Sequence, residues 1–263
     1  MIQKKFLSWL CPGNVETNNN LAAAQAVRMN GTGTWLTKTS EYRRWLQGKF
    51  KHLWLTGPAG CGKTVLTTAV IDDLRETKKS SHSQIAVLWY FFDHKDPRKV
   101  KPIVFLESII RQLVDQAADS LQSLQEVYNN ARGCGPSLDD LYSAVARLIA
   151  CFEQVYLVID GVDECISPLE AIDMDKKFSR KPHEGSGSRV KVFLSGVYTV
   201  ALENAFWRLD PFIMEANERN HGDIAIFARH NLRKLLIWKN ERETPLEFIE
   251  DLVGKINKVA NGL

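Results

Sequence analysis

The chain has 263 residues, 44% of them hydrophobic and 25% charged, which is enough apolar material for one large α/β domain or for a domain with a small appendage. The formal net charge of +3 is close to balance and argues neither for nor against nucleic acid, which is not among the expected partners. No stretch approaches the ~18 apolar residues that a membrane span requires. Five cysteines without metal-ligand spacing favour a reducing compartment, and we expect the protein in the cytoplasm.

The first 30 residues are weakly patterned and are predicted to be a leader or linker, with a short helix over 21–29. A second short helix is expected over 40–46, with Ser40 as its cap and Gly48 closing it. Trp35 is expected to anchor packing. Its position upstream of a glycine-rich stretch also leaves open that a purine base stacks on it.

That glycine-rich stretch carries the pattern Gly-x-x-x-x-Gly-Lys-Thr, which is typical of loops that bind the phosphates of a nucleoside triphosphate. The apolar run 53–55 before it predicts a buried strand, and the spacing of apolar residues over 65–74 predicts a helix that ends near residue 79. Strand, glycine loop and helix, in this order, are the context that the motif requires. The sequence therefore predicts a nucleotide site here.

Each residue type in this loop has a physical reason to be there. Glycines let the backbone curl so that successive N–H groups face phosphate oxygens, and the following helix turns its positive dipole end to the same anion. Lys63 is predicted to reach the outer phosphates, and the Thr64 hydroxyl is predicted to ligate Mg²⁺. The residues expected to contact the nucleotide are Gly57, Pro58, Ala59, Gly60, Cys61, Gly62, Lys63 and Thr64.

A continuous apolar run over 85–92 predicts a strand buried on both faces, and a charged turn over 93–97 ends it. Ligands in open α/β sheets gather at the carboxyl ends of strands, so Asp93 or His94 could contact the site, although a solvated turn is the favoured interpretation. Helices are predicted over 103–117 and 121–131. A third is predicted from a capping box at Ser137 and Asp140 to about residue 152.

Another apolar strand begins at residue 155 and delivers Asp160 at its end. This is the Walker-B arrangement, in which an aspartate holds Mg²⁺, commonly through water, opposite the hydroxyl of Thr64. Gly161 allows a close approach of the backbone, and two further carboxylates follow. Glu164 is the first candidate to orient the water that attacks the terminal phosphate, and Asp163 is the alternative.

Strands are also predicted over 190–195 and 212–215, and helices are predicted over about 224–235 and from Thr244-Pro245 onward. The order of elements predicts a three-layer α/β/α sandwich with a parallel sheet, followed by a partial small helical subdomain. We expect the nucleotide-binding core to span 31–216 and the helical subdomain to span 217–263.

Two of these motifs together resemble the NACHT domain of fungal-type NOD-like receptors, which belong to the STAND class of P-loop NTPases. The first motif runs from Gly57 to Thr64, and the second is Asp160-Gly161-Val162-Asp163-Glu164. A small residue after the first aspartate, with the acidic pair two positions further, distinguishes NACHT domains from AAA+ proteins. The resemblance covers residues 31–263 and includes the segments 31–36 and 92–97.

The resemblance implies a switch that binds ATP or GTP with Mg²⁺, hydrolyses it slowly and serves in non-self recognition or cell-death signalling. In the family, a serine or threonine after the fourth strand is followed by an arginine that reads the phosphates. Here Ser195 retains the hydroxyl and is expected at the nucleotide, whereas position 196 is glycine. We expect self-association only where C-terminal parts of such a receptor are present.

Two other functions remain open on the sequence. The glycine at position 196 favours a scaffold that binds nucleotide without hydrolysing it. A conventional P-loop kinase or AAA+ motor is a third possibility, although no site for an acceptor substrate is legible and the spacing at Gly161 disfavours a motor.

Overall fold

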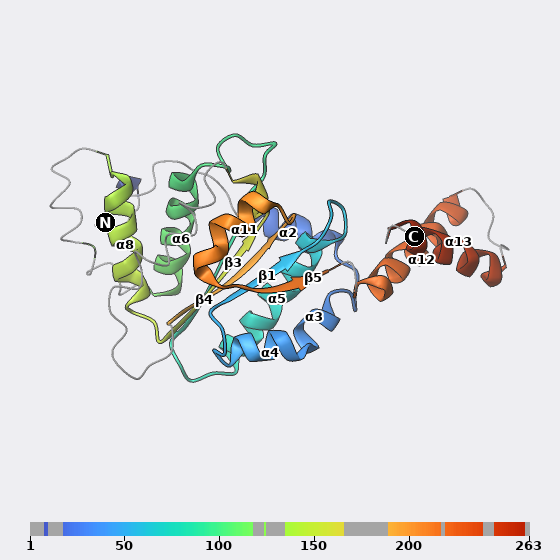
Figure 1. Ribbon diagram of the computed structural model, residues 1–263, viewed down its shortest axis with the longest axis horizontal. Coiled ribbons are helices and arrows are strands. Elements are labelled where there is room, and N and C mark those ends of the chain that lie inside the picture. Colours follow the sequence, from blue (N-terminus) through green and yellow to red (C-terminus); the bar gives the residue numbers. More distant parts are fainter. Residues whose placement is uncertain are drawn as a thin grey trace.

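Five parallel strands form one sheet in the order β2-β3-β4-β1-β5 (Figure 1). The computed structural model describes residues 8–9, 18–117, 124, 135–165, 189–216, 219–238 and 245–260. The strands are β1 (His52–Thr56), β2 (Ile85–Phe91), β3 (Gln154–Asp160), β4 (Val190–Gly196) and β5 (Phe212–Glu215). Because β4 lies between β1 and β3, the loops after these three strands meet at one edge of the sheet.

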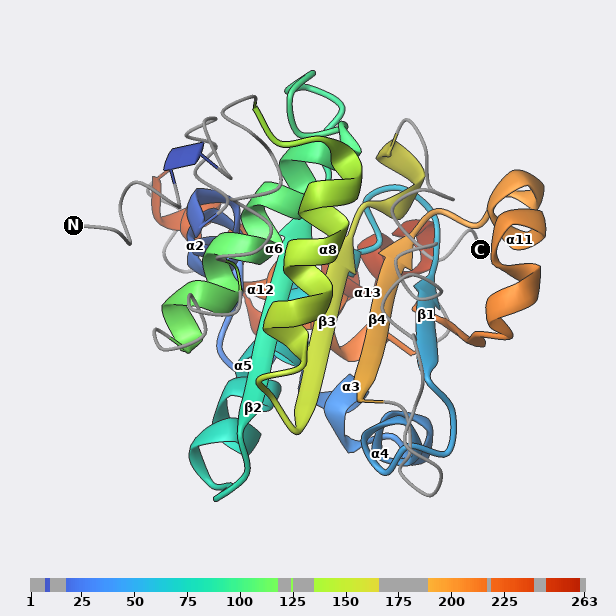
Figure 2. The same cartoon turned by 90° about the vertical axis from the view of Figure 1, so that its left-hand side faces the viewer.

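Helices cover both faces of this sheet and complete a three-layer α/β/α sandwich, as predicted. One face is covered by α2 (Asn18–Val27), α3 (Thr34–Lys38), α4 (Ser40–Leu46) and α5 (Lys63–Lys79), which share a hydrophobic cluster with it. The other face is covered by α6 (Pro102–Gln116), α8 (Leu138–Ile149) and α11 (Val200–Phe206). Figure 2 shows α6 and α8 in front of the strands, with α3 and α4 below.

Side chains of β2 illustrate how the sheet supplies both clusters. Ala86, Leu88 and Tyr90 belong to the core under α6 and α8, whereas Ile85 and Val87 belong to the core under α5. This alternation is the pleat of a strand that is buried on both faces, which is why its sequence is apolar throughout.

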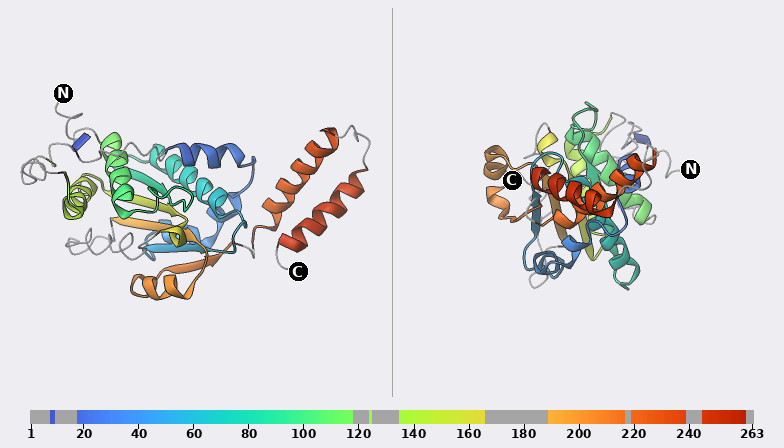
Figure 3. Two further views of the ribbon diagram at one scale, coloured as in Figure 1. Left: turned by 90° about the horizontal axis from the view of Figure 1, so that it is seen from above. Right: turned by 90° about the vertical axis from the view of Figure 1, so that its right-hand side faces the viewer.

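Two further helices, α12 (His221–Trp238) and α13 (Leu246–Ala260), pack on each other beyond the sandwich (Figure 3). Their contact has a small hydrophobic cluster of its own, formed by Ala228, Ile249 and Val253. The described segments also contain two short 3₁₀ turns, η2 (Val162–Glu164) and η3 (Trp207–Leu209). None of the helices in the described segments combines the length and the apolar character needed to cross a membrane.

Most predicted elements are confirmed within a residue or two, including the capping box of α8 at Ser137 and Asp140. The predicted cap of α4 is wrong, because the hydroxyl of Thr39, not that of Ser40, accepts from the backbone of Tyr42. Helix α8 ends at Ile149 and not near residue 152, and α11 was not predicted from the sequence. The expected helix over 121–131 and the start at Thr244 lie outside the described residues, except for Leu124.

Residues 18–28, which were expected to be part of a leader or linker, pack on the sandwich. Leu21 of α2 is buried in the cluster beneath α5. Arg28 forms an ion pair with Asp72 of α5 at 2.8 Å, and Gln25 donates to the same carboxylate at 2.7 Å. The packed region therefore begins before residue 31.

Candidate functional site

The glycine loop, residues 57–64, connects β1 to α5 at the carboxyl edge of the sheet. Gly60 and Gly62 have φ values of 81° and 90°, in the left-handed region that other residues avoid. A Cβ at either position would meet no atom within 4 Å, so the backbone conformation alone requires glycine there. Gly62 is the N-cap of α5, and the positive end of that helix therefore faces the loop.

Lys63 folds back over this loop. Its Nζ donates to the carbonyl oxygens of Gly57 at 2.9 Å and Pro58 at 2.8 Å, and lies 4.0 Å from Cys61 Sγ. Ala59 is exposed at the tip of the loop. The ammonium group thus lies against carbonyl groups of the loop, and it can exchange these neutral partners for an anion.

Asp160 at the end of β3 lies opposite the start of α5 and is buried. Its Oδ2 accepts from Thr64 Oγ1 at 2.7 Å, and its Oδ1 accepts from Thr67 Oγ1 at 2.9 Å and from the Ser195 hydroxyl. Burial raises the pKa of Asp160, while these hydrogen bonds and the charge of Lys63 act in the opposite direction. Carboxylate and hydroxyl oxygens are the donors that Mg²⁺ prefers, so Thr64 and Asp160 fit this ion.

Ser195 and Thr67 both donate to Oδ1 of the aspartate. Ser195 lies in β4 and is fully buried, so its hydroxyl contacts Asp160 and does not face the open side of the loop. Thr67 lies one turn after Thr64 on α5 and also donates to Asp160. Thr67 was not among the residues predicted for the site, although its position three residues after Thr64 places both on the same helix face.

Asp163 is anchored to the chain that follows β4. Its Oδ1 accepts from the backbone N–H of Val197 at 3.0 Å. A Cβ added at Gly196 would lie 2.6 Å from this Oδ1 and 2.9 Å from Val162 Cγ1. Glycine at position 196 therefore makes room for the side chains of Val162 and Asp163 in the η2 turn.

Glu164 is held by the turn after β2. Its Oε2 accepts from the backbone N–H of His94 at 2.7 Å and lies 2.7 Å from His94 Nδ1. Gly161 has a φ of 69°, and a Cβ there would lie 3.0 Å from the carbonyl oxygen of Phe92, which confirms the close approach expected at this glycine. The favoured interpretation of His94 as part of a solvated turn is incomplete, because His94 directly contacts a predicted site residue.

A cavity of about 500 Å³ adjoins the glycine loop on the side of α12. Asn220 connects its two sides: this residue is 2% exposed and its Nδ2 donates to the Cys61 carbonyl oxygen at 2.7 Å. The walls are mainly apolar and come from the segment before α3, from the loop, from α5 and from the helix pair, with Met29, Thr32, Val65, Leu66, Ile224 and Phe227 among them. Its size and its walls fit a purine nucleoside.

Trp35 has a structural partner beside this cavity. Asp223 Oδ2 accepts from Trp35 Nε1 at 3.1 Å and from the backbone N–H of Gly33 at 2.8 Å. Burial raises the pKa of Asp223, and these two hydrogen bonds lower it. Trp35 packs against the cluster beneath α5, in agreement with the favoured expectation of a packing anchor.

The fold and the convergence of residues from the carboxyl ends of β1, β3 and β4 define a P-loop NTPase-like α/β domain. Residues 31–196 match the family model described as Nephrocystin 3, N-terminal, and the chain belongs to this family. Over 157 residues the chain is 26% identical to the vegetative incompatibility protein HET-E-1 of Podospora anserina. The two matches confirm the resemblance to NACHT domains of fungal NOD-like receptors.

The extent of these similarities is limited. The alignment with HET-E-1 covers 57% of this chain and 11% of HET-E-1, so the chain spans about a tenth of that relative's length. Among solved structures, the Aeropyrum pernix ORC2 protein, determined in ADPNP-ADP complexes, aligns with a TM-score of 0.42 and 16% identity. That alignment covers 74% of this chain and 46% of the ORC2 chain.

Proposed function

We propose that this chain binds a nucleoside triphosphate, ATP or GTP, together with Mg²⁺ and hydrolyses it slowly. The observation that carries the proposal is the contact between Thr64 and Asp160 at the N-terminus of α5, where the charge of Lys63 acts on the Asp160 carboxyl. An ammonium group, a hydroxyl, a buried carboxylate and a helix N-terminus together form the chemistry that a Mg²⁺-bound polyphosphate requires. The adjoining cavity accommodates the nucleoside.

Each proposed role follows from where the side chain lies. Thr64 and Asp160 hold Mg²⁺, which when bound offsets the negative charge of the phosphates. Ser195 keeps the Asp160 carboxylate oriented, and Lys63 binds the outer phosphate oxygens. Glu164 orients the attacking water, and its contact with His94 fixes the direction of the carboxylate.

In the wider setting, we propose that this domain is the nucleotide-controlled module of a NOD-like receptor that acts in the cytoplasm in non-self recognition or cell-death signalling. The support is the similarity to a protein whose name records vegetative incompatibility. Residues 31–216 would be the nucleotide-binding core, preceded by the packed helix α2, and 217–263 part of a helical subdomain. Self-association would depend on further C-terminal parts of the receptor.

The test of nucleotide binding is the Lys63→Ala variant, titrated with a fluorescent triphosphate. A charge-assisted hydrogen bond contributes about 1.5–3 kcal/mol, so we expect the affinity to fall at least tenfold while the circular dichroism spectrum stays unchanged. Lys79→Ala is the matched control, because Lys79 ends the same helix and, among the described residues, pairs with exposed Glu76. Equal affinity of the Lys63 variant and the wild type would refute the proposal.

A nucleotide-binding scaffold without hydrolysis is the second candidate. The specific observation is Gly196, which offers no guanidinium to the phosphates and which the packing of Asp163 requires. Turnover of labelled triphosphate by the wild type, compared with Glu164→Gln, separates the two candidates. Phosphate release that depends on Glu164 supports the hydrolase, and binding without Glu164-dependent release supports the scaffold.

A further inference from the structure

The outer strand β2 carries the most association-prone segment of the sheet. Its sequence, Ile-Ala-Val-Leu-Trp-Tyr-Phe over 85–91, contains no charge, proline or glycine and is rich in aromatic and β-branched residues. Segments of this kind pair readily with copies of themselves when one edge of the strand is open. Among the described strands, β2 has a neighbour on one side only, the parallel strand β3.

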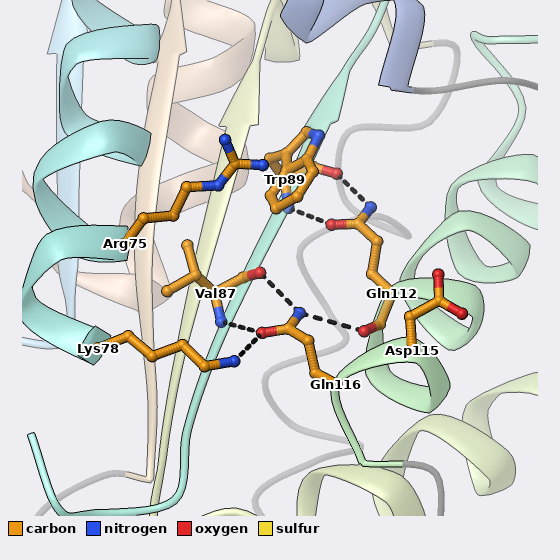
Figure 4. Close-up of a pocket in the computed structure, with 7 residues that line it drawn as sticks. All are labelled: Arg75, Lys78, Val87, Trp89, Gln112, Asp115 and Gln116. Carbon is orange, nitrogen blue, oxygen red and sulfur yellow. Dashed lines mark hydrogen bonds between the residues drawn. The ribbon is translucent and has the colours of Figure 1, made fainter.

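Two glutamines of α6 satisfy the backbone on the open side. Gln112 Oε1 accepts from the N–H of Trp89 at 2.9 Å, and its Nε2 donates to the carbonyl oxygen of the same residue at 2.8 Å. Gln116, one turn later, makes the equivalent pair with Val87 at 3.1 Å and 2.9 Å. Each carboxamide therefore replaces one peptide group of a neighbouring strand (Figure 4).

Further contacts fix the orientation of both carboxamides. Gln112 Nε2 also donates to Ser108 Oγ at 3.1 Å, and Gln116 Nε2 also donates to the carbonyl oxygen of Gln112 at 3.1 Å. Lys78 of α5 donates to Gln116 Oε1 at 2.7 Å. The lone pairs and protons that face the strand are thus set by partners on α5 and α6.

Charged side chains also lie beside the open edge of β2. Arg75 of α5 lies over the Trp89 ring, with its guanidinium carbon 4.4 Å from the ring centroid. Arg75, Lys78 and Asp115 line a cavity of about 260 Å³ along the strand, and Figure 4 shows these charged side chains flanking the two glutamines. Charged residues beside an edge strand disfavour the approach of an apolar strand.

We propose that Gln112 and Gln116 close the edge of β2 against self-association, and that the strand which pairs with this edge once it is opened is β2 of a second copy of the chain. The geometry favours a second copy because two β2 edges related by a two-fold axis would satisfy each other's exposed N–H and C=O groups, and both segments are uncharged. The other edge strand, β5, has four residues and offers a shorter pairing surface. This inference does not depend on the proposed nucleotide function.

The test combines Gln112→Met with Gln116→Met, which keeps side-chain length and removes both carboxamides. We expect the wild type to sediment as a monomer and the double variant to form dimers and larger species over a hundredfold range of protein concentration. Gln25→Met with Gln47→Met is the matched control, because Gln25 binds Asp72 of α5 and Gln47 is the C-cap of α4. The control should sediment as the wild type does.

Amide hydrogen exchange shows whether the association uses this edge. In dilute, monomeric double variant, the amides of Val87 and Trp89 should exchange at least tenfold faster than in the wild type, and protection should return as the variant associates. Association without renewed protection of these amides would overturn the proposal, as would a folded double variant that stays monomeric. If the double variant does not fold, Gln116→Met alone supplies the folded species, because Gln116 is only partly buried.

Discussion

At the scale of single residues, the contact between Asp163 and the chain after β4 separates two carboxylates that the sequence leaves interchangeable. Asp163 accepts from the Val197 N–H and occupies the space that a side chain at position 196 would need. Glu164 instead lies at the open turn beside His94. We therefore propose a positioning role for Asp163 and retain Glu164 as the residue that orients the water.

This assignment predicts opposite outcomes for two variants. Asp163→Ala should lower the free energy of unfolding by about 1–2 kcal/mol, because the Val197 N–H loses its acceptor. Glu164→Gln should leave stability and nucleotide affinity unchanged but reduce turnover at least tenfold, since an amide cannot act as a base. Urea denaturation and phosphate release, measured on both variants, test the pair.

The roles of the two carboxylates are reversed if Asp163→Ala retains wild-type stability but loses turnover. Asp163→Asn is the control for the structural contact, because its amide oxygen can still accept from Val197. That variant should remain close to wild-type stability.

At the scale of elements, β1 begins with a histidine that is buried against η3. His52 is 4% exposed, and its Nδ1 lies 2.9 Å from the carbonyl oxygen of Leu209. Burial, together with the nearby charge of Lys51, lowers the pKa of His52 to about 4, while the contact with Leu209 acts in the opposite direction. The folded protein therefore keeps this ring neutral at pH values where the unfolded chain protonates it.

Stability should consequently fall as the pH decreases. Between the ordinary pKa of about 6.5 and the folded value, the unfolded state binds one more proton at His52, so the free energy of unfolding falls by up to about 1.4 kcal/mol per pH unit. The buried carboxyls with raised pKa values make the opposite contribution to the pH dependence of the free energy of unfolding, and this contribution is retained in a His52→Gln variant. Denaturation of both proteins from pH 7 to 4.5 should show the steeper decline in the wild type, and parallel curves would contradict it.

Whether the sequence predicts a structural feature depends on how far apart in the chain the interacting residues lie. The strands ending in Thr56 and Asp160 follow from apolar runs, and the cap at Ser137 follows from spacing, since each is determined within a few neighbours. No local sequence pattern indicates the contacts between segments that are distant in the chain. Asn220 binds Cys61 across 159 positions, and His94 binds Glu164 across 70.

For Gly196, the resemblance indicated what was missing, and the structure supplied the reason. The sequence shows only that arginine is absent from a position where the family has it. The short distances from the position that a Cβ on Gly196 would occupy to Asp163 Oδ1 and Val162 Cγ1 show that a side chain there would displace these two side chains. This steric contact joins the end of β4 to the η2 turn, and a local sequence pattern cannot predict a contact between segments so far apart in the chain.

At the scale of the whole molecule, the helix pair α12–α13 is connected to the sandwich near the first turn of α12. Asn220 binds the glycine loop, Asp223 binds Gly33 and Trp35, and Arg219 forms an ion pair with Glu41 at 3.0 Å. Two of these three connections lie beside the cavity next to the loop. We therefore expect a change in the loop to be passed directly to α12.

Removing the hydrogen bond between Asn220 and Cys61 should weaken nucleotide binding while leaving the charged residues of the proposed site unchanged. We expect Asn220→Ala to lower nucleotide affinity about three- to tenfold, because the Cys61 carbonyl oxygen loses a buried donor that orients the loop. Arg229→Ala, which removes an ion pair confined to the helix pair, is the control and should bind as the wild type does. Calorimetric titration of both variants measures the difference, and equal affinities would contradict the coupling.

Helix α12 is long enough for a small tilt at one end to move its other end by a large distance. Its 18 residues extend about 27 Å from the end that contacts the glycine loop. A tilt of about 5° at that end would carry the far end by roughly 2 Å, a displacement comparable to the shifts that repack helix interfaces. A rearrangement of one peptide group at Cys61 would thus move the far end of α12. A neighbouring domain in contact with that end would respond to the movement without contacting the ligand.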